Sequence, residues 1–549
     1  MKLNKKILAL SLMGLMLFST GCGSSNKTAE GKVIDAALDA DPTTIDPQKG
    51  SDLYGNIVVI NTMEPLLRLK DGKEEGTTEI EKAGASDYKV SADGLTYTFT
   101  IRDGLKWEDG KDLTAKDYEY GIKRTADPKT GAESAFLLEP IKNFKKVNDP
   151  KSNTPVDQLG VKAIDDKTLE IKLEKPTSYF LELVPYRTMY PQRKDLVDKF
   201  GDKYGSEKEN YLACGPYKVA EWTHGSKIVL EKNDSYWNKD GVKNDKVNLK
   251  IMSDPTAVYS AFENNEVFKC TSRLPEWVNK FKKDDSVDEH LVPLPTVDYL
   301  ALNHKDKLLS NKKIRQALLL ALDRKGMNEA IFKGLSGEAE YWVPKAISID
   351  GINYREKAGN PMESLRKDNP DPKKLLIDGM KELGLGEDPS KVEINFICTN
   401  SPIVKKYAEF IQQNYHKALG INVKLEMMEW PVLAGRVNKG DYQVGYLAWT
   451  ADYDDPNSML SLFKSNAGAV NTGWKNAEFD ALLSKASESK DINTSIDDYK
   501  KAEKILIDDA VVVPITDGKL YVFNKKFLKG SVYNQFSTMG YQTQYIEKK

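Results

Sequence analysis

The sequence is poor in the two residue types that most often build metal sites and covalent cross-links, since its 549 residues include only four cysteines and four histidines. No two cysteines form a Cys-x-x-Cys pair, and no two histidines have the spacing of a zinc site. We therefore expect no metal site, no bound cofactor and no disulfide framework. We interpret three cysteines as small buried residues and leave open whether two of them are bonded; they are Cys214, Cys270 and Cys398.

An excess of charge of one sign is also missing. Lysine and arginine together number 80, and aspartate and glutamate 82. No basic stripe, zinc-finger spacing or phosphate-binding glycine loop is present, so we expect no nucleic-acid partner. The sequence has no Gly-x-Ser-x-Gly motif. Glu108 and Asp109 are candidates for an acid and base pair, but their glycine-rich turn is typical of a structural role, and we do not predict an enzyme.

The apolar run near the start of the chain is short. It covers residues 7–18, which makes 12 residues, whereas a membrane-spanning helix needs about 20. Lys2, Lys5 and Lys6 precede it and small residues follow it, which is typical of a targeting segment.

Ser19-Thr20-Gly21-Cys22 at the end of this segment resembles a bacterial lipobox, in which the cysteine receives a diacylglycerol and signal peptidase II cleaves before it. We expect residues 1–21 to be a lipoprotein signal peptide and residues 22–32 to be the lipidated Cys22 with a flexible tether. The protein would then be anchored to the lipid bilayer of the cell membrane on its extracytoplasmic face. An ordinary cleaved secretory peptide is the alternative, but it leaves Cys22 without a purpose.

Apolar strands alternate with amphipathic helices between residues 391 and 449. This alternation predicts an α/β region whose strands are partly parallel. The expected strands are residues 392–397, 421–427 and 442–447, and the expected helices are Pro402–Leu419 and residues 430–437.

Nearer the start, the pattern predicts a strand over Val33–Leu38 and two helices. One helix is expected over residues 56–69. The other is expected over residues 114–124, where Thr114 and Asp117 form a capping box at its start.

An acidic loop directly follows the last of the predicted α/β strands. It carries Asp452, Asp454 and Asp455 and is closed by Pro456. Ligands of α/β sheets bind at the carboxyl ends of strands, so Asp452, which is nearest the strand, is expected to face a cleft beside Trp449. The alternatives are an ordinary solvated turn and, with less support from the ligand positions, a calcium loop.

Residues 449–456 resemble the ligand-clamp segment of oligopeptide-binding proteins, the extracytoplasmic receptors of ABC peptide importers. Other segments resemble parts of the same family in the same order, and they are residues 41–47, 102–110, 212–219, 233–237, 429–430 and 511–515. The resemblance implies that Asp452 receives the α-ammonium of a bound peptide. It also implies that neighbouring backbone groups, at Thr450 and Ala451, bond the peptide main chain.

Four aromatic residues are candidates for the walls of the ligand site, although each can instead be packed in the core; they are Trp430, Tyr446, Trp449 and Tyr453. Arg436 is the candidate by position for binding the peptide carboxylate. Because Tyr446 stands where some relatives carry a basic residue, the sequence does not predict a peptide length.

The resemblance implies an α/β fold of the periplasmic-binding-protein-like type II (cluster C). This fold has two large lobes, an extra inserted domain, a ligand cleft between the lobes and a hinge of two connecting strands, expected at residues 291–302 and 511–515. The expected division is lobe I at 33–66, 176–296 and 514–549, the inserted lobe II at 67–175, and lobe III at 297–513. Residues 334–372 match the family poorly and receive no role.

The function that the resemblance implies is capture of oligopeptides and their delivery to the membrane subunits of an ABC permease, by a protein that acts as a monomer. The alternative is the same fold with another solute. A peptide pheromone, a dipeptide, an oligosaccharide, haem or a nickel chelate are the candidates.

Overall fold

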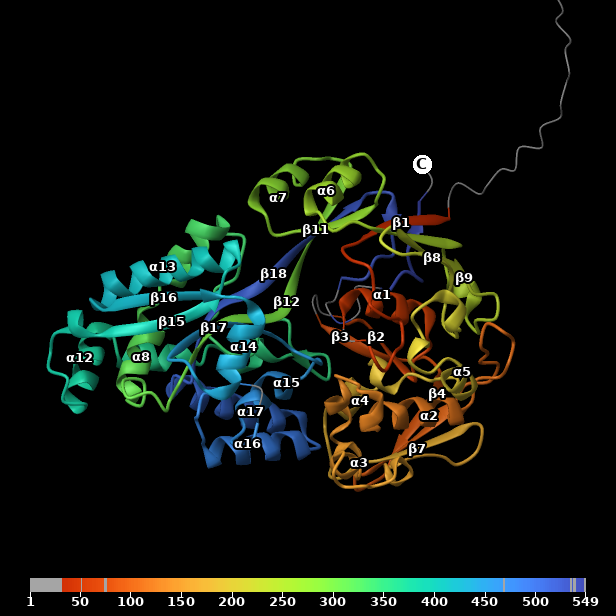
Figure 1. Ribbon diagram of the computed structural model, residues 1–549, viewed down its shortest axis with the longest axis horizontal. Helices are drawn as coiled ribbons and strands as arrows, with labels where there is room; N and C mark the ends of the chain where they lie inside the picture. Colours follow the sequence, from red (N-terminus) through yellow and green to blue (C-terminus); the bar gives the residue numbers. More distant parts are fainter. Residues whose placement is uncertain are drawn as a thin grey trace, which may run out of the picture.

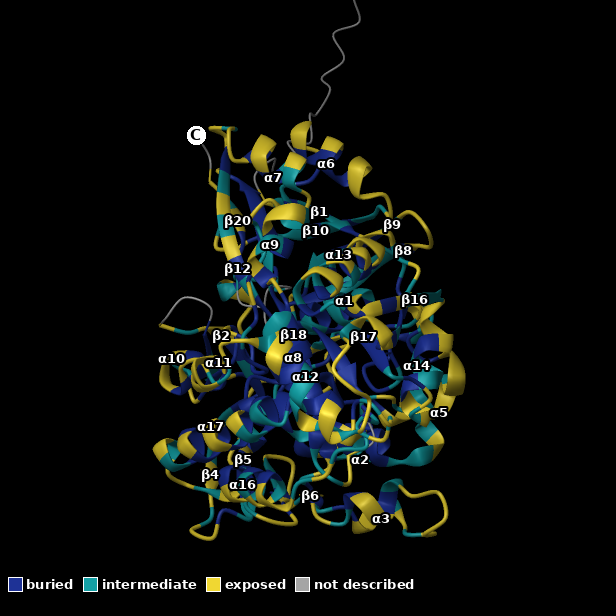
Figure 2. Ribbon diagram, turned by 90° about the vertical axis from the view of Figure 1, so that its left-hand side faces the viewer, coloured by how far each residue is buried: buried dark blue, intermediate teal, exposed yellow. Residues whose placement is uncertain are grey.

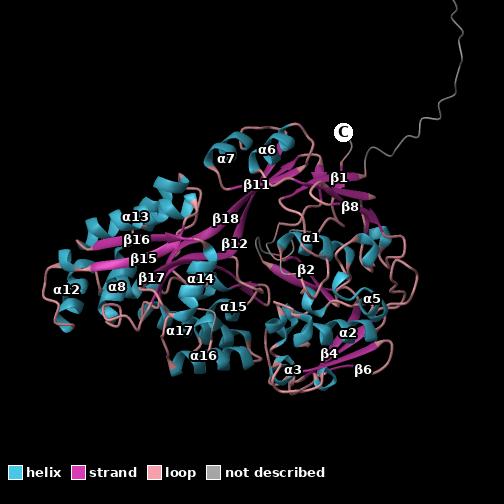
Figure 3. Cartoon of the chain, viewed as in Figure 1, coloured by secondary structure: helices cyan, strands magenta, loops and turns pink. Residues whose placement is uncertain are grey.

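The computed structural model describes residues 32–50, 52–73, 77–467, 470–533, 536 and 540–547. The predicted signal peptide, Cys22 and nearly all of the predicted tether lie outside these residues. Within the described part of the chain, no helix is long and apolar enough to span a bilayer. Figure 1 shows two halves of mixed helix and strand with long strands between them, and Figure 3 shows that helices flank the strands in both.

The right-hand half of Figure 1 contains two four-stranded sheets whose apolar side chains belong to one hydrophobic core. In the first sheet, β1 is parallel to β10 and the other pairs are antiparallel. Its strands, in spatial order, are β1 (Val33–Leu38), β10 (Lys246–Ile251), β9 (Lys227–Lys232) and β8 (Tyr217–Thr223). The second sheet is antiparallel throughout, with strands β4 (Ala85–Val90), β5 (Thr96–Ile101), β7 (Thr168–Lys172) and β6 (Val161–Ala163).

The helix predicted near residue 114 is confirmed as α2 (Ala115–Ala126). Thr114 lies at its N-cap, and the backbone N–H of Thr114 donates to the Asp117 carboxylate over 2.8 Å. The reciprocal bonds of a capping box therefore start this helix, as the spacing predicts.

The left-hand half of Figure 1 is built on a six-stranded sheet in the order β11-β18-β12-β17-β15-β16. Its strands are β11 (Lys269–Ser272), β18 (Val512–Lys525), β12 (Val287–Leu302), β17 (Val444–Thr450), β15 (Glu393–Thr399) and β16 (Asn422–Met428). The larger helices around it are α8 (Lys312–Ala321), α12 (Pro372–Glu382), α13 (Pro402–Leu419), α14 (Trp430–Lys439), α16 (Ala477–Glu488) and α17 (Ile492–Asp508).

The predicted α/β region is confirmed in this sheet, because β15 is parallel to both β16 and β17. Helix α13 has the predicted bounds: Pro402 occupies its first turn, and Gly420 ends it at φ 80°. Figure 2 shows buried residues concentrated in the central strands and exposed residues on the outward faces of peripheral helices such as α17.

Strands β12 and β18 are the two connecting strands, and they pair antiparallel along most of their length. One end of the pair packs with α6 (Pro255–Glu263) and α7 (Pro275–Phe281) in a small core. The other end lies in the large core of residues 297–515. The register shifts between Pro293 and Val297, where Pro293 and Pro295 have no N–H to donate.

The expected lobe boundaries stay a prediction. Buried residues from the segments assigned to lobe I and to the inserted lobe II share one core, so core membership does not separate them. The segment assigned to lobe III supplies the other large core.

The prediction of one long helix over residues 56–69 is wrong. Helix α1 (Leu53–Thr62) ends before Pro65, and β2 (Leu67–Asp71) follows, paired with β3 (Thr78–Lys82). Proline disfavours helical dihedrals at the preceding residue, and the cap residue Met63 is already extended at φ −111° and ψ 157°. The apolar residues after Pro65 alternate as in a strand.

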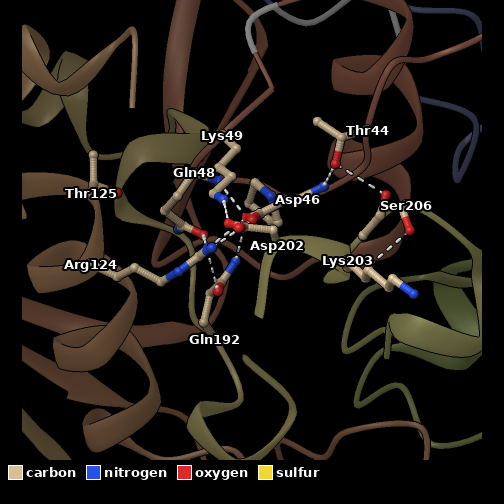
Figure 4. A network of polar contacts seen from close by, with 12 residues as sticks. Thr44, Asp46, Gln48, Lys49, Arg124, Thr125, Gln192, Asp202, Lys203 and Ser206 are labelled. Carbon is tan, nitrogen blue, oxygen red and sulfur yellow. Dashed lines mark hydrogen bonds and ion pairs between the residues drawn. The ribbon is translucent and has the colours of Figure 1, made fainter. Parts of the chain in front are cut away.

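A buried ion pair ties the segment of residues 41–47 to α2. Both terminal nitrogens of the Arg124 guanidinium donate to the Asp46 carboxylate, over 2.7 and 2.6 Å. Gln192 accepts a further bond from Arg124 over 2.9 Å, and Gln48 lies beside the pair (Figure 4). Both charged side chains are almost fully enclosed, so each depends on the other for compensation.

Residues 334–372, which the sequence left without a role, are part of the large core. Glu503 of α17 accepts hydrogen bonds from the backbone N–H groups of Trp342 and Val343, over 2.9 and 2.8 Å. It also forms a buried ion pair with Arg355 over 2.5 Å. These bonds fix the segment against α17.

We predict that Asp46→Asn lowers the free energy of unfolding by about 3 kcal/mol, because it leaves the Arg124 charge buried without a counter-charge. Urea unfolding followed by circular dichroism measures the change. The matched control is Asp378→Asn, which removes a carboxylate from the exposed Lys374–Asp378 pair and should leave the unfolding midpoint unchanged. Equal midpoints for the two variants would contradict the role given to the buried pair.

Candidate ligand-binding site

A cavity of about 1050 Å³ lies between segments that are far apart in the sequence. One wall is formed by residues between Phe136 and Leu183, and the other by residues between Trp449 and Ser487. The lining mixes aromatic rings, backbone and charged groups. A space of this size and character is typical of a small-molecule or peptide site.

The loop after β17 brings Asp452 to this cavity. The backbone is fixed on both sides of the turn: the N–H of Ala451 donates to the Pro295 carbonyl over 2.7 Å, and the N–H of Asp452 donates to Ser458 Oγ over 2.7 Å. The loop is therefore held by its main chain, which leaves the Asp452 side chain available.

The three acids of this loop differ in their partners. Asp454 accepts bonds from the Ser348 N–H over 2.6 Å and from Thr78 Oγ1 over 2.5 Å, and also from the Ser348 hydroxyl. Asp455 caps α15 (Pro456–Leu460) by accepting from the Asn457 N–H over 2.7 Å. These two carboxylates thus have structural roles, and the hydrogen bond from Thr78 to Asp454 fixes the loop to β3.

Among the described residues, no side chain or backbone group forms a hydrogen bond or ion pair with the Asp452 carboxylate. Burial alone raises its pKa to about 6, and no neighbouring cation lowers it. A partly enclosed carboxylate at a cavity wall without a counter-charge is suited to a cationic ligand group.

Aromatic rings stand next to Asp452. Trp449 and Tyr453 line the cavity, and Tyr453 stacks on Tyr179 with 4.9 Å between ring centroids. Tyr179 was missed from the sequence. The sequence gives only a weak indication that Tyr179 lines a site. The residue follows the Lys175-Pro176 break at the end of a strand, and most residues in such a position belong to an ordinary turn.

The structure brings together Trp449, Asp452 and Tyr453 in the cavity lining, which does not include the other predicted site residues. Trp430 is 55% exposed at the start of α14. Arg436 forms ion pairs with Glu426 over 2.7 Å and with Asp441 over 3.3 Å. Their ligand roles, like those of the three cavity residues, stay predictions.

The remaining predicted residues lie on or just after β17. Tyr446 is buried and its hydroxyl donates to Asp298 over 2.9 Å. Tyr446 and Trp449 are three positions apart on one strand, so their side chains point to opposite faces. Thr450 bonds the Thr296 hydroxyl over 2.8 Å, and Ala451 is buried.

The described residues include no group of three or more histidine, cysteine or acidic side chains arranged to hold a metal ion. Cys214, Cys270 and Cys398 are each buried and unpaired. The interpretation of these cysteines as small buried residues is confirmed.

The chain is similar to known proteins along most of its length. Residues 79–471 match the family model of bacterial extracellular solute-binding proteins, family 5. The chain is 33% identical to the oligopeptide-binding protein OppA of Bacillus subtilis over 531 residues, which cover 94% of each protein. It is 34% identical to the dipeptide-binding protein DppE of the same organism over 543 residues, which cover 96% of each.

Solved structures agree with this similarity. Listeria monocytogenes OppA bound to peptide superposes with a TM-score of 0.72 at 29% identity, covering 94% of this chain and 99% of the other. The E. coli murein tripeptide binding protein MppA gives a TM-score of 0.76 at 26% identity, covering 95% and 99%. The predicted type II periplasmic-binding fold is confirmed, and the chain belongs to the bacterial extracellular solute-binding proteins of family 5.

Proposed function

We propose that the protein captures peptides that have a free amino terminus and delivers them to an ABC importer. The observation that carries the proposal is the unpaired Asp452 carboxylate at the wall of a cavity of about 1050 Å³. A peptide ammonium supplies the missing positive charge, and Trp449 and Tyr453 pack against the first residues. The names of the relatives above support a peptide ligand.

We propose that the protein binds its ligand and does not catalyse a reaction on it. Of the acids in the loop, Asp454 and Asp455 are committed to hydrogen bonds with the protein, so the loop offers no pair of free carboxylates for hydrolysis. One chain supplies both walls of the cavity, and we propose that it acts as a monomer. The lipidated Cys22 would hold it at the outer face of the cell membrane, next to the permease.

We predict that Asp452→Asn weakens the affinity for tri-alanine at least ~30-fold, because an enclosed ammonium then loses its counter-charge. Calorimetry with tri-alanine and N-acetyl-tri-alanine measures this. The acetylated peptide is the matched control, and it should bind wild type and variant equally weakly.

Small molecules released on denaturing the purified wild type, identified by mass spectrometry, provide a second readout of the same prediction. A family of peptides is expected, and the Asp452→Asn protein should carry far fewer. A single sugar, haem or a nickel chelate in their place would overturn the proposed ligand class.

We predict that affinity for tri-alanine is constant above about pH 7 and falls roughly tenfold for each pH unit below 6. The Asp452 carboxyl has its pKa raised to about 6 in the empty protein, so below that pH it holds a proton, which an ammonium ligand must displace. The same raised pKa means that the Asp452 contribution to folding stability declines as pH rises from about 4 to 6. A pH series of calorimetric titrations, with Asp452→Asn alongside, isolates this carboxyl: a wild-type profile parallel to that of the variant contradicts the prediction.

We predict that Cys22→Ser releases the protein from the membrane fraction of the producing cells, because stable anchoring depends on the acyl chains. The mass of the mature wild-type protein should include the lipid on Cys22. If the serine variant stays with the membrane fraction, the anchor lies elsewhere.

A further inference from the structure

Among the described residues, buried polar atoms without hydrogen-bond partners gather in and just after α4 (Phe180–Leu183). They include Glu182 Oε2, Tyr186 Oη and Arg187 Nη2. Folded proteins leave few such atoms, so a group of them in one turn needs an explanation. One explanation is a bound ligand that supplies the missing hydrogen-bond partners.

Arg187 is the most unusual member of the group. Its side chain is buried and donates one hydrogen bond, from Nε to the Pro47 carbonyl over 2.9 Å. Burial lowers the pKa of this guanidinium, and no carboxylate among the described residues is bonded to it. The nearby acids are already bonded: Asp46 to Arg124, and Asp52 to the Gly55 N–H and the Thr43 hydroxyl.

Other buried arginines are compensated. Some pair with carboxylates and others donate to several backbone carbonyls; they are Arg124, Arg193 and Arg355 in the first group and Arg315 and Arg324 in the second. Arg187 therefore carries a buried positive charge, and among the described residues only its Nε has a hydrogen-bond partner.

Arg187 and Tyr186 line a second cavity, of about 100 Å³, together with residues of α1 and β2 that include Asn56 and Arg68. Arg68 is already paired with Glu64 over 2.7 Å. A cavity of this volume is large enough for a carboxylate group, given that one water occupies about 30 Å³.

The short stretch from Leu183 to Arg187 connects the two cavities, because Leu183 lines the cavity of Asp452 while Tyr186 and Arg187 line the small one. Burial and the neighbouring carboxylates, with Asp452 first among them, raise the pKa of the Tyr186 hydroxyl. Among the described residues, Asp452 and Arg187 have no ion-pair partner, and they border the two cavities that this stretch connects. A ligand with a positive group and a negative group fits both.

We propose that Arg187 binds the carboxylate of the peptide whose ammonium binds Asp452. This inference rests on the proposed function and extends it to the ligand's second charge. The planar guanidinium matches a carboxylate with two parallel hydrogen bonds. It gives Arg187 the role for which Arg436 was considered, since Arg436 is already bonded to Glu426 and Asp441.

The test compares di-, tri- and tetra-alanine, each as the free acid and as the carboxyl-terminal amide, by calorimetry. For the peptides that bind wild type, the acid is expected to bind at least ~30-fold more tightly than the amide. In Arg187→Met this ratio should fall to about one, while Arg187→Lys should keep part of it. Arg366→Met, which removes an exposed arginine paired with Glu340, is the matched control and should keep the wild-type ratio.

A second variant tests the position of the guanidinium without removing its charge. A Cβ atom at Gly50 would lie 2.5 Å from Arg187 Nη2, so Gly50→Ala displaces the guanidinium and should also reduce the ratio. Equal binding of acid and amide by wild type overturns the inference, and so does a full ratio in Arg187→Met. If peptides with a free and with an amidated carboxyl terminus bind equally well, only the role of Arg187 is excluded, and the proposed function is unaffected. If no peptide with a free amino terminus binds, the proposed function itself is wrong.

Discussion

The antiparallel pairing of β12 with β18 is the constraint on which the rest of the structure depends. The pair runs from the small core around α6 and α7 into the large core, so it joins the two halves of the molecule. β17 is paired to β12 from Thr296 to Leu302, and its end delivers the acidic loop. The position of Asp452 relative to the cavity is therefore a consequence of strand register.

Charge compensation divides the interior into two kinds of site. In the hydrophobic cores, buried charged side chains form ion pairs with residues of opposite charge, as Arg124 does with Asp46 and Arg355 with Glu503. Around the proposed ligand site, by contrast, Asp452 and Arg187 form no ion pair with any residue that the structure describes. Burying an unpaired charge is unfavourable, so a ligand that supplies both opposite charges gains from groups that the fold leaves uncompensated.

Much of the fold was predictable where local chemistry decides the outcome. Pro402 and Gly420 mark the two ends of α13, and Thr114 with Asp117 marks the start of α2. The prediction of a helix over residues 56–69 was wrong because it followed the apolar pattern and neglected Pro65, which disfavours helical dihedrals at the residue before it. In the site, the strand end pointed to Asp452, and strand periodicity would have excluded Tyr446 from the face of Trp449. Long-range partners were beyond sequence reasoning: Thr78 meets Asp454 across 376 positions of chain, and nothing local marks Arg187 as unpaired.

The three enclosed cysteines have a consequence for a protein that works outside the cytoplasm. Only the thiolate form of cysteine reacts readily with oxidants or disulfides. Burial raises the pKa of all three thiols, that of Cys398 to about 11. In the folded chain these sulfurs are therefore inert in an oxidising compartment. Before folding they have no such protection, so in an oxidising compartment wrong cross-links can form only until the cores bury these thiols.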